Sequence, residues 1–326
     1  MFKEAKTIKR LDVEEAPVGK ISHYWLHIIN NKYGEPIRIP IVVARGVNPG
    51  PVLGVTAAMH GNELNGIPVI QQLFKGLNVN RLSGTVVGAL AMNIPGLLLE
   101  QRVFNEGTDL NRTTPGKADG NCPQVYAYRL VDRILSQFNY HIDLHTASFG
   151  RINSFYIRAD MQNPVTAEMA KLQNADIILH NLGNDGTLRG TAEDLGIHSI
   201  TVELKDPHVF QWDVIEDGLV GIRNVMYHLN MLEGMVIPAI NATVVCQSSK
   251  WIYTDEGGIL QVFPDVCEHL KAGDKIAEVR NIFGEMTKEY FAPHDGVVIG
   301  RSINPLNQTG SRIIHFGKDI SYVNGH

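Results

Sequence analysis

The stretch that decides the fold is residues 52–63, which read VLGVTAAMHGNE. Its apolar first part follows Pro51 and is typical of a buried β-strand. Beyond it, apolar residues recur at spacings of three and four and predict a helix: Ile67, Ile70, Leu73, Phe74 and Leu77. His60 and Glu63 therefore fall on the turn between a buried strand and a helix. Open α/β sheets place their ligand sites at such strand ends.

An imidazole and a carboxylate on this turn could both point at one small cation. Zinc accepts nitrogen and oxygen ligands together, and catalytic zinc sites use three protein ligands and keep a fourth position open. Outside such a site, a histidine followed by a glycine would be an ordinary turn residue. The zinc hypothesis therefore requires a third ligand from elsewhere in the chain.

A strand predicted over 141–146 supplies that candidate. Its alternation places His141, Asp143 and His145 on one face. We expect His145, at the end of the strand, to be the third ligand, and Asp143 to orient a ligand without binding the metal itself. The alternative is that His145 is a hydrogen-bonded core residue.

Two further segments carry side chains suited to hydrolysis. Glu203 lies near the end of an apolar strand predicted over 197–204, where a buried carboxylate must be satisfied by a partner. Beside a metal it could act as a general base. The long loop over 95–121 contains Arg102 and Arg112. Arginine is usually a surface residue, but its guanidinium group grips carboxylates through two parallel hydrogen bonds and could polarise a substrate carbonyl.

The remaining pattern divides the chain in two. Before about residue 235, strands and helices alternate as in an α/β domain: strands over 24–29, 37–44, 84–90, 155–158 and 177–179, and helices over 123–138, 164–174 and 213–232. A glycine-rich passage over 182–190 is expected to form a pocket wall, with Arg189 as a candidate for substrate contact. From 236 to 326 there is no helical period, and short strand patterns predict a small all-β domain: 243–246, 258–263, 275–279 and 296–300.

Four motifs, in this order, carry a resemblance to a known family: His60-x-x-Glu63, Asp109-Leu110-Asn111-Arg112, Asp143-Leu144-His145 and Val202-Glu203-Leu204. Over about residues 45 to 320 the chain resembles the succinylglutamate desuccinylase/aspartoacylase family of zinc-carboxypeptidase-like hydrolases. The resemblance implies a mixed central sheet flanked by helices over residues 1–235, followed by a barrel-sandwich-like β domain over 236–326.

The resemblance also implies a role for each site residue. His60, Glu63 and His145 would bind one Zn²⁺ per chain. Glu203 would be the base that activates water, and Arg102 the arginine that polarises the carbonyl. Asn111 and Arg112 would bind the substrate carboxylate.

The function expected on these grounds is zinc-dependent hydrolysis of the amide bond in an N-acylated amino acid or a related small molecule. One alternative is a zinc carboxypeptidase acting on a short peptide, and another is a metal-binding protein without turnover. A lipoyl or biotinyl carrier is disfavoured, because Lys288 lies in a predicted strand, whereas the hairpin tip that a carrier lysine occupies falls near Gly284.

The composition of the chain limits the classes of partner that it is expected to bind. The chain has 326 residues and a net charge of −5, without a basic stripe for nucleic acid. It has neither the apolar core of a signal peptide at its start nor a run long enough to cross a bilayer. Its three cysteines are widely spaced, which fits neither a disulfide framework nor a thiolate zinc site. We expect a cytoplasmic protein with a small-molecule substrate and no nucleic-acid or membrane partner, and with a homodimer or higher oligomer as candidate assemblies.

Overall fold

The strand that precedes His60 lies in the middle of a large sheet. The computed structural model describes residues 5–148, 150–183 and 186–323. The strands are β1 (Lys6–Ile8), β2 (Lys20–Asn30), β3 (Pro36–Arg45), β4 (Asn48–Ala57), β5 (Ser83–Ala89), β6 (Tyr140–His145), β7 (Arg151–Asn153), β8 (Phe155–Ala159), β9 (Ile177–His180), β10 (His198–Leu204), β11 (Thr243–Tyr253), β12 (Gly258–Val262), β13 (His269–Leu270), β14 (Lys275–Arg280), β15 (Met286–Phe291), β16 (Gly296–Ser302), β17 (Leu306–Asn307) and β18 (Arg312–Val323). The α-helices are α1 (Gly66–Lys75), α2 (Ile94–Leu98), α3 (Cys122–Arg133), α4 (Pro164–Lys171), α5 (Leu188–Asp194) and α6 (Trp212–His228). Short 3-10 turns are η1 (Val13–Glu15), η2 (Val79–Arg81), η3 (Asn105–Gly107), η4 (Leu110–Arg112) and η5 (Leu135–Gln137).

The sheet follows the order β1-β2-β3-β5-β4-β6-β10-β8-β9-β11-β18-β16-β13, and β7 pairs with β16. The strands β5, β4, β6 and β10 are parallel neighbours. By contrast, β2 and β3 form an antiparallel hairpin and β8 runs antiparallel to β10. The predicted mixed central sheet is therefore confirmed.

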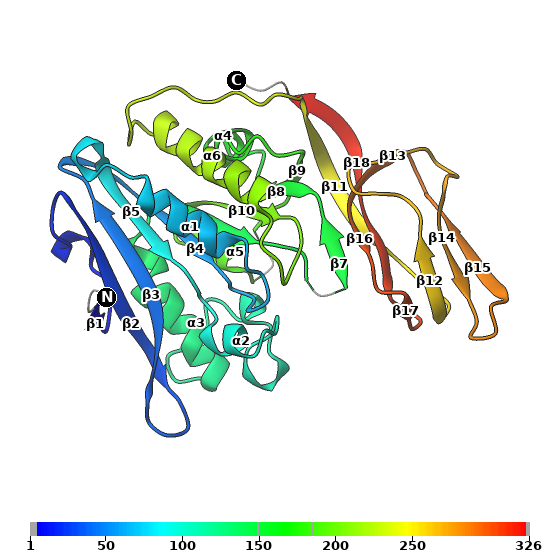
Figure 1. Ribbon diagram of the computed structural model, residues 1–326, viewed down its shortest axis with the longest axis horizontal. Coiled ribbons are helices and arrows are strands. Elements are labelled where there is room, and N and C mark those ends of the chain that lie inside the picture. Colours follow the sequence, from blue (N-terminus) through cyan, green and yellow to red (C-terminus); the bar gives the residue numbers. More distant parts are fainter. Residues whose placement is uncertain (1–4, 149, 184–185, 324–326) are drawn as a thin grey trace.

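Helices cover both faces of the central sheet (Figure 1). Apolar side chains of α1, α4 and α6 pack on one face, against Val55 of β4 and Leu144 of β6. The helices α3 and α5 pack on the other face with β2 and β3. Because Leu144 faces α1 and α6, its neighbours Asp143 and His145 face the opposite way, as the alternation predicted.

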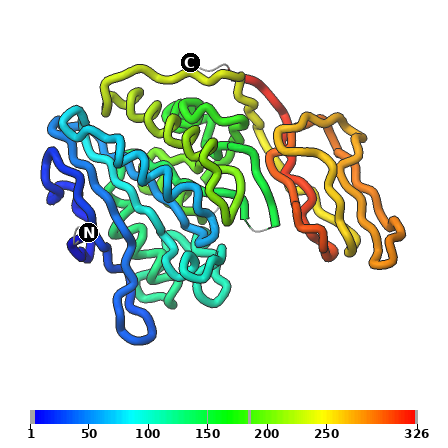
Figure 2. Tube along the Cα trace, in the orientation of Figure 1, coloured from blue at the N-terminus to red at the C-terminus, as the bar shows by residue number. Residues whose placement is uncertain are grey.

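The strands β11 to β18 form the C-terminal β module (Figure 1). The strands β15, β14, β12 and β17 make a second sheet, which shares an apolar core with β16 and β18 of the large sheet, including Ile276, Val298 and Phe316. Figure 2 shows this module at the opposite end of the molecule from the N-terminal strands. Because β9 pairs with β11, the large sheet runs continuously into the module; the division at residue 235 stays a prediction.

Several segments differ from the sequence prediction, among them the helix expected over 213–232, which ends at His228. The helix expected over 123–138 ends at Arg133, because Ile134 departs from helical geometry (φ −126°, ψ −65°), and η5 follows it. The first residues of the loop expected over 95–121 belong to α2, which ends at Leu98. The rest of this loop contains the short helical turns η3 and η4. The short elements β7 and α5 were not predicted, because three to seven residues are too few to display a period.

The position of Lys288 and the length of the helices also bear on the sequence prediction. Lys288 lies within β15, where its ammonium group pairs with Asp255 at 3.0 Å, and not at the hairpin tip. The strand predicted around Lys288 is therefore confirmed. None of the helices in the described ranges is both long enough and apolar enough to cross a bilayer.

Candidate active site

The turn after β4 is shaped by close packing. Ala58 has a φ of +51°, in the left-handed region, and so redirects the chain at the end of the strand. A Cβ atom on Gly61 would lie 2.0 Å from the backbone carbonyl carbon of Gly96, so only glycine fits where this turn meets α2. This packing fixes His60 and Glu63 beside the loop that carries Arg102.

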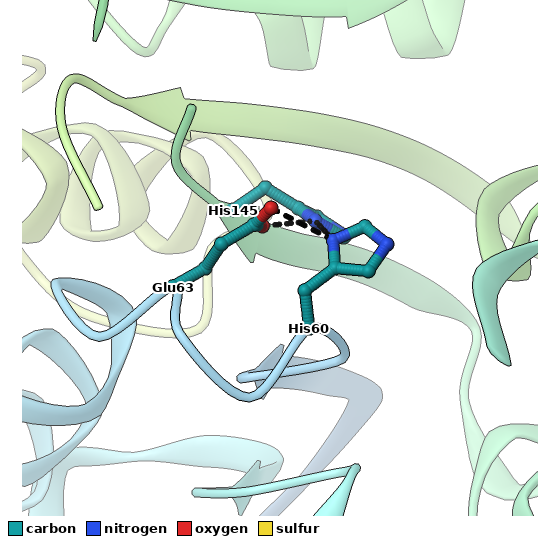
Figure 3. Close-up of side chains that lie close together, drawn as sticks. All are labelled: His60, Glu63 and His145. Atoms are coloured by element: carbon teal, nitrogen blue, oxygen red, sulfur yellow. Dashed lines mark hydrogen bonds and ion pairs between the residues drawn. The ribbon is translucent and has the colours of Figure 1, made fainter. Parts of the chain in front are cut away.

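Three buried side chains converge at this turn (Figure 3). His60 and Glu63 come from the turn itself, and His145 comes from the end of β6. Nδ1 of His60 lies 2.9 Å from Oε1 of Glu63, and Nδ1 of His145 lies 2.8 Å from Oε2. The two Nδ1 atoms are 3.2 Å apart.

This spacing fits a metal ion. Donor atoms about 2.0–2.1 Å from a tetrahedral zinc lie about 3.3 Å from one another. The three observed separations are close to this value, and the donor set of two imidazoles and one carboxylate is one that zinc prefers. His60, Glu63 and His145 are thus brought together in the arrangement that the sequence predicted.

The second nitrogen of each histidine is held by a carboxylate. Nε2 of His145 donates to Asp143 at 2.8 Å, and Nε2 of His60 lies 3.2 Å from Asp109. Burial alone would raise the pKa values of both aspartates, but the neighbouring histidines, and Arg102 beside Asp109, lower them. An ionised carboxylate at Nε2 selects the tautomer whose Nδ1 lone pair faces the cluster.

Asp143 therefore occupies the orienting position expected of it, whereas the role of Asp109 was not foreseen. Asp109 also accepts hydrogen bonds from Nε and Nη2 of Arg102, at 3.3 and 3.0 Å. The sequence signal for a role of Asp109 was its place in the motif Asp109-Leu110-Asn111-Arg112. The carboxylate of Asp109 thus links His60, a predicted metal ligand, to Arg102, the predicted catalytic arginine.

Arg102 lies directly against the cluster of His60, Glu63 and His145. Its Nη1 donates to Glu63 at 3.0 Å and contacts Ser148. Ser148 and the backbone N–H of Thr146 also donate to Glu63, at 3.1 and 3.2 Å. Although burial opposes ionisation, the adjacent histidines hold the pKa of Glu63 well below its ordinary value. Arg102 remains one-third exposed and so faces the pocket as well as the cluster.

Glu203 stands beside His145, because β10 pairs in register with β6. One carboxylate oxygen accepts from Nδ2 of Asn153 at 3.2 Å. The other accepts from the Tyr156 hydroxyl at 3.3 Å and lies 3.4 Å from Nε of Arg158. A carboxylate held by three donors keeps a fixed orientation while one edge faces the pocket.

The predicted substrate-binding residues line the same pocket. Asn111 and Arg112 are in η4, and the side-chain Oδ1 of Asn111 accepts a hydrogen bond from the backbone N–H of Leu188 at 2.8 Å. This bond ties η4 to α5. Arg189 of α5 is almost fully buried and donates to Glu193 at 2.7 Å and to Asn181 at 2.6 Å.

All these walls enclose one pocket, with about 790 Å³ of empty space including its open mouth. That volume suits a small molecule. Its charged lining among the described residues is dominated by arginine, with Glu63 and Glu203 as the carboxylates: Arg102, Arg112, Arg151, Arg158, Arg189 and Arg312. We call it the active-site pocket; its positive charge favours anionic ligands.

A sequence profile of the succinylglutamate desuccinylase/aspartoacylase catalytic domain matches residues 49–229. The chain belongs to this family. N-alpha-acetyl-L-2,4-diaminobutyric acid deacetylase of Halomonas elongata is 25% identical over 279 residues, which cover 81% of each protein. Members of the family are deacylases of N-acyl amino acids.

Solved structures of the succinylglutamate desuccinylase/aspartoacylase family share the fold over nearly the whole chain. A succinylglutamate desuccinylase/aspartoacylase from Rhodobacter sphaeroides superposes with a TM-score of 0.85 at 20% identity, covering 95% of this chain and 98% of that one. The product-bound ectoine utilization protein EutE (DoeB) from Ruegeria pomeroyi gives 0.84 at 21% identity, covering 93% and 97%. At this identity the likeness concerns the fold, and it includes the C-terminal β module.

Sequence reasoning missed the side chains that surround Glu203. Tyr156 and Arg158 come from β8, which pairs with β10, and Asn153 comes from the preceding β7, which pairs with β16. The alternation of Tyr156 and Arg158 along one strand face was the only local signal. It also missed Trp251 and Arg312, which enter the active-site pocket from the C-terminal β module.

Proposed function

We propose that this protein is a zinc-dependent hydrolase that removes the acyl group from an N-acylated amino acid. The observation that carries the proposal is the buried cluster of His60, Glu63 and His145 with Glu203 in the same pocket. His60, Glu63 and His145 would hold the zinc. When bound there, zinc would act as a Lewis acid toward the carbonyl oxygen and toward water.

Glu203 is the general base and acid of the proposed reaction. Its carboxylate takes a proton from the attacking water while the water oxygen bonds to the amide carbon. It then gives that proton to the amine nitrogen as the carbon–nitrogen bond breaks. Hydrogen bonds from Asn153 and Tyr156 hold the carboxylate in place for both transfers.

Arg102 stabilises the negative charge that develops on the carbonyl oxygen. Its contacts with Asp109, Glu63 and Ser148 use four of its five N–H groups, which fixes the plane of the guanidinium. The other Nη2 hydrogen is left for the carbonyl oxygen. Asn111 and Arg112, on the η4 wall, bind the carboxylate of the amino acid.

Pocket size supports a small substrate. Trp251 and Arg312 of the C-terminal β module line the pocket together with the metal cluster. A long peptide would have to pass these side chains, whereas an acylated amino acid fits within them. This favours deacylation over the removal of a residue from a peptide.

A substrate panel tests this function. N-acetyl and N-succinyl amino acids and matching free dipeptides and tripeptides are supplied to the zinc-loaded protein, and released amine is measured. We expect the acylated amino acids to be hydrolysed and the tripeptides to remain intact. Release of the last residue from the peptides alone would indicate a carboxypeptidase, and no release at all a metal-binding protein.

Replacing Asp143 with asparagine is expected to weaken zinc binding. The amide cannot accept the Nε2 proton of His145 as an ionised carboxylate does, so the ligand tautomer is no longer selected. Loss of such an orienting group weakens metal affinity by about tenfold to a hundredfold. Competition with a chromophoric chelator measures the change in dissociation constant. Asp160→Asn, a substitution outside the pocket, is the control and should bind zinc as the wild type does. Equal zinc affinities in the wild type, Asp143→Asn and Asp160→Asn would refute the role assigned to Asp143.

A further inference from the structure

The wall of the active-site pocket nearest the C-terminal β module is built from three strands. Trp251 comes from β11, Arg312 from β18 and Arg151 from β7. The strand β7 pairs with β16, which pairs with β18, and β18 pairs with β11 (Figure 1). Backbone pairing therefore holds the three side chains in one place.

The indole ring of Trp251 organises two positive charges. The guanidinium carbon of Arg312 lies 5.1 Å from the ring centroid, and that of Arg151 lies 5.6 Å from it. Both distances are within the range of cation–π attraction. The indole is in turn stacked on buried His315, at 5.0 Å with an interplanar angle of 12°. The ring is thus supported from the interior and positions both guanidinium groups.

These two arginines differ from others in the pocket. Arg102, Arg158 and Arg189 each pair with a carboxylate. Across residues 5–148, 150–183 and 186–323, by contrast, Arg151 and Arg312 form no ion pair with an acidic side chain. Burial lowers the pKa of Arg312, and the positive charge of nearby Arg102 lowers it further. Two guanidinium groups without a counter-charge are suited to bind an anion.

The pocket has room beyond these arginines. A second hollow shares Arg102, Arg151 and Arg312 with the active-site pocket and continues between Tyr253 and Asn307. A substrate whose carbonyl lies at Arg102 can therefore reach Arg151 and Arg312. The η4 wall, with Asn111 and Arg112, is a separate part of the pocket lining.

We propose that Arg151, Arg312 and Trp251 form a subsite for a carboxylate at the far end of the substrate's acyl group. This inference rests on the proposed function, in which Asn111 and Arg112 take the carboxylate of the amino acid. The preferred substrates are then amino acids acylated with a dicarboxylic acid. An acetyl group would leave the subsite unfilled.

A matched pair of substrates tests this specificity. N-succinyl and N-butanoyl derivatives of the same amino acid have acyl chains of equal length and differ in the terminal carboxylate. We expect the wild-type protein to favour the succinyl substrate in kcat/KM by about tenfold to a hundredfold. Arg312→Gln and Arg151→Gln should each lower that ratio by about tenfold, and Arg312→Lys should restore part of it. Arg81→Gln, an exposed residue outside both hollows, should leave the ratio unchanged.

Binding of the free acids provides a readout that does not need turnover. Succinate, butanoate and inorganic phosphate are titrated into the wild-type protein and the arginine variants by calorimetry. We expect succinate to bind at least about tenfold more tightly than butanoate, and this advantage to be lost in Arg312→Gln and Arg151→Gln. Thermal unfolding of each variant shows whether it is folded.

The outcomes separate the two proposals. Preferential succinate binding that depends on Arg151 and Arg312, without hydrolysis of any acylated amino acid, would support the subsite and refute the proposed function. Hydrolysis with no succinyl preference would overturn the subsite. So would variants that impair both substrates equally, because the subsite would then serve the amino acid. Tighter binding of phosphate than of succinate would also overturn the carboxylate assignment.

Discussion

Replacing Glu203 with glutamine is expected to lower kcat by about a hundredfold to ten-thousandfold, the range of general acid–base catalysis. Glutamine has nearly the same shape and can still accept a hydrogen bond from Tyr156, so the local packing should persist. It cannot take a proton from water or return one to the amine. Both proton transfers of the proposed reaction are therefore lost together.

The comparison of kcat between Glu203→Gln and the wild type requires that both proteins bind zinc equally well. Zinc content and unfolding temperature of Glu203→Gln should match those of the wild type, because Glu203 is not among the three ligand residues. Glu216→Gln, an exposed substitution on α6, serves as the matched control and should keep full activity. Wild-type kcat in folded, zinc-loaded Glu203→Gln would show that another group is the base.

Removing the metal is the second change with a large expected effect. Dialysis against a chelator should abolish hydrolysis, a loss of about a thousandfold or more, because a metal ion contributes several kcal/mol to transition-state stabilisation. One equivalent of zinc should restore the rate. The unfolding temperature should fall on removal, since a ligand present at a thousand times its dissociation constant stabilises the native state by about 4 kcal/mol.

Substitution of a predicted zinc-binding residue distinguishes the effect of losing the metal from damage that the chelator does to the protein. His145→Gln should show the same low activity and should not recover when zinc is added. His198→Gln changes a histidine at the other end of β10, away from the cluster, and should behave as the wild type. Full hydrolysis by the metal-free protein would exclude a zinc mechanism.

The cluster of His60, Glu63 and His145 could be predicted from sequence because its geometry is mostly local. His60 and Glu63 share one turn, and His145 ends a strand whose alternation is plain in the sequence. The only long-range requirement is that β4 and β6 be parallel neighbours, which is common in α/β sheets and is what the structure has. The mixed sheet and the C-terminal β module were likewise foreseen from periodicity and from the resemblance to the family.

The surroundings of Glu203 could not be predicted in the same way. Tyr156 and Arg158 reach it because β8 inserts antiparallel beside β10, a choice that depends on the whole sheet and not on local pattern. Trp251 and Arg312 lie over 100 residues from His145 in sequence, and they reach the pocket through the pairing of β11 with β9 and of β7 with β16. Non-local strand pairings of this kind leave no periodic trace.

The central claim is that His60, Glu63 and His145 bind a zinc ion. Anomalous X-ray diffraction from crystals of the zinc-loaded protein, collected on both sides of the zinc absorption edge, tests it most directly. The claim predicts one strong anomalous peak per chain, about 2.0–2.2 Å from Nδ1 of His60, Nδ1 of His145 and an oxygen of Glu63. No peak at this position, or a zinc peak held by other side chains, would contradict it.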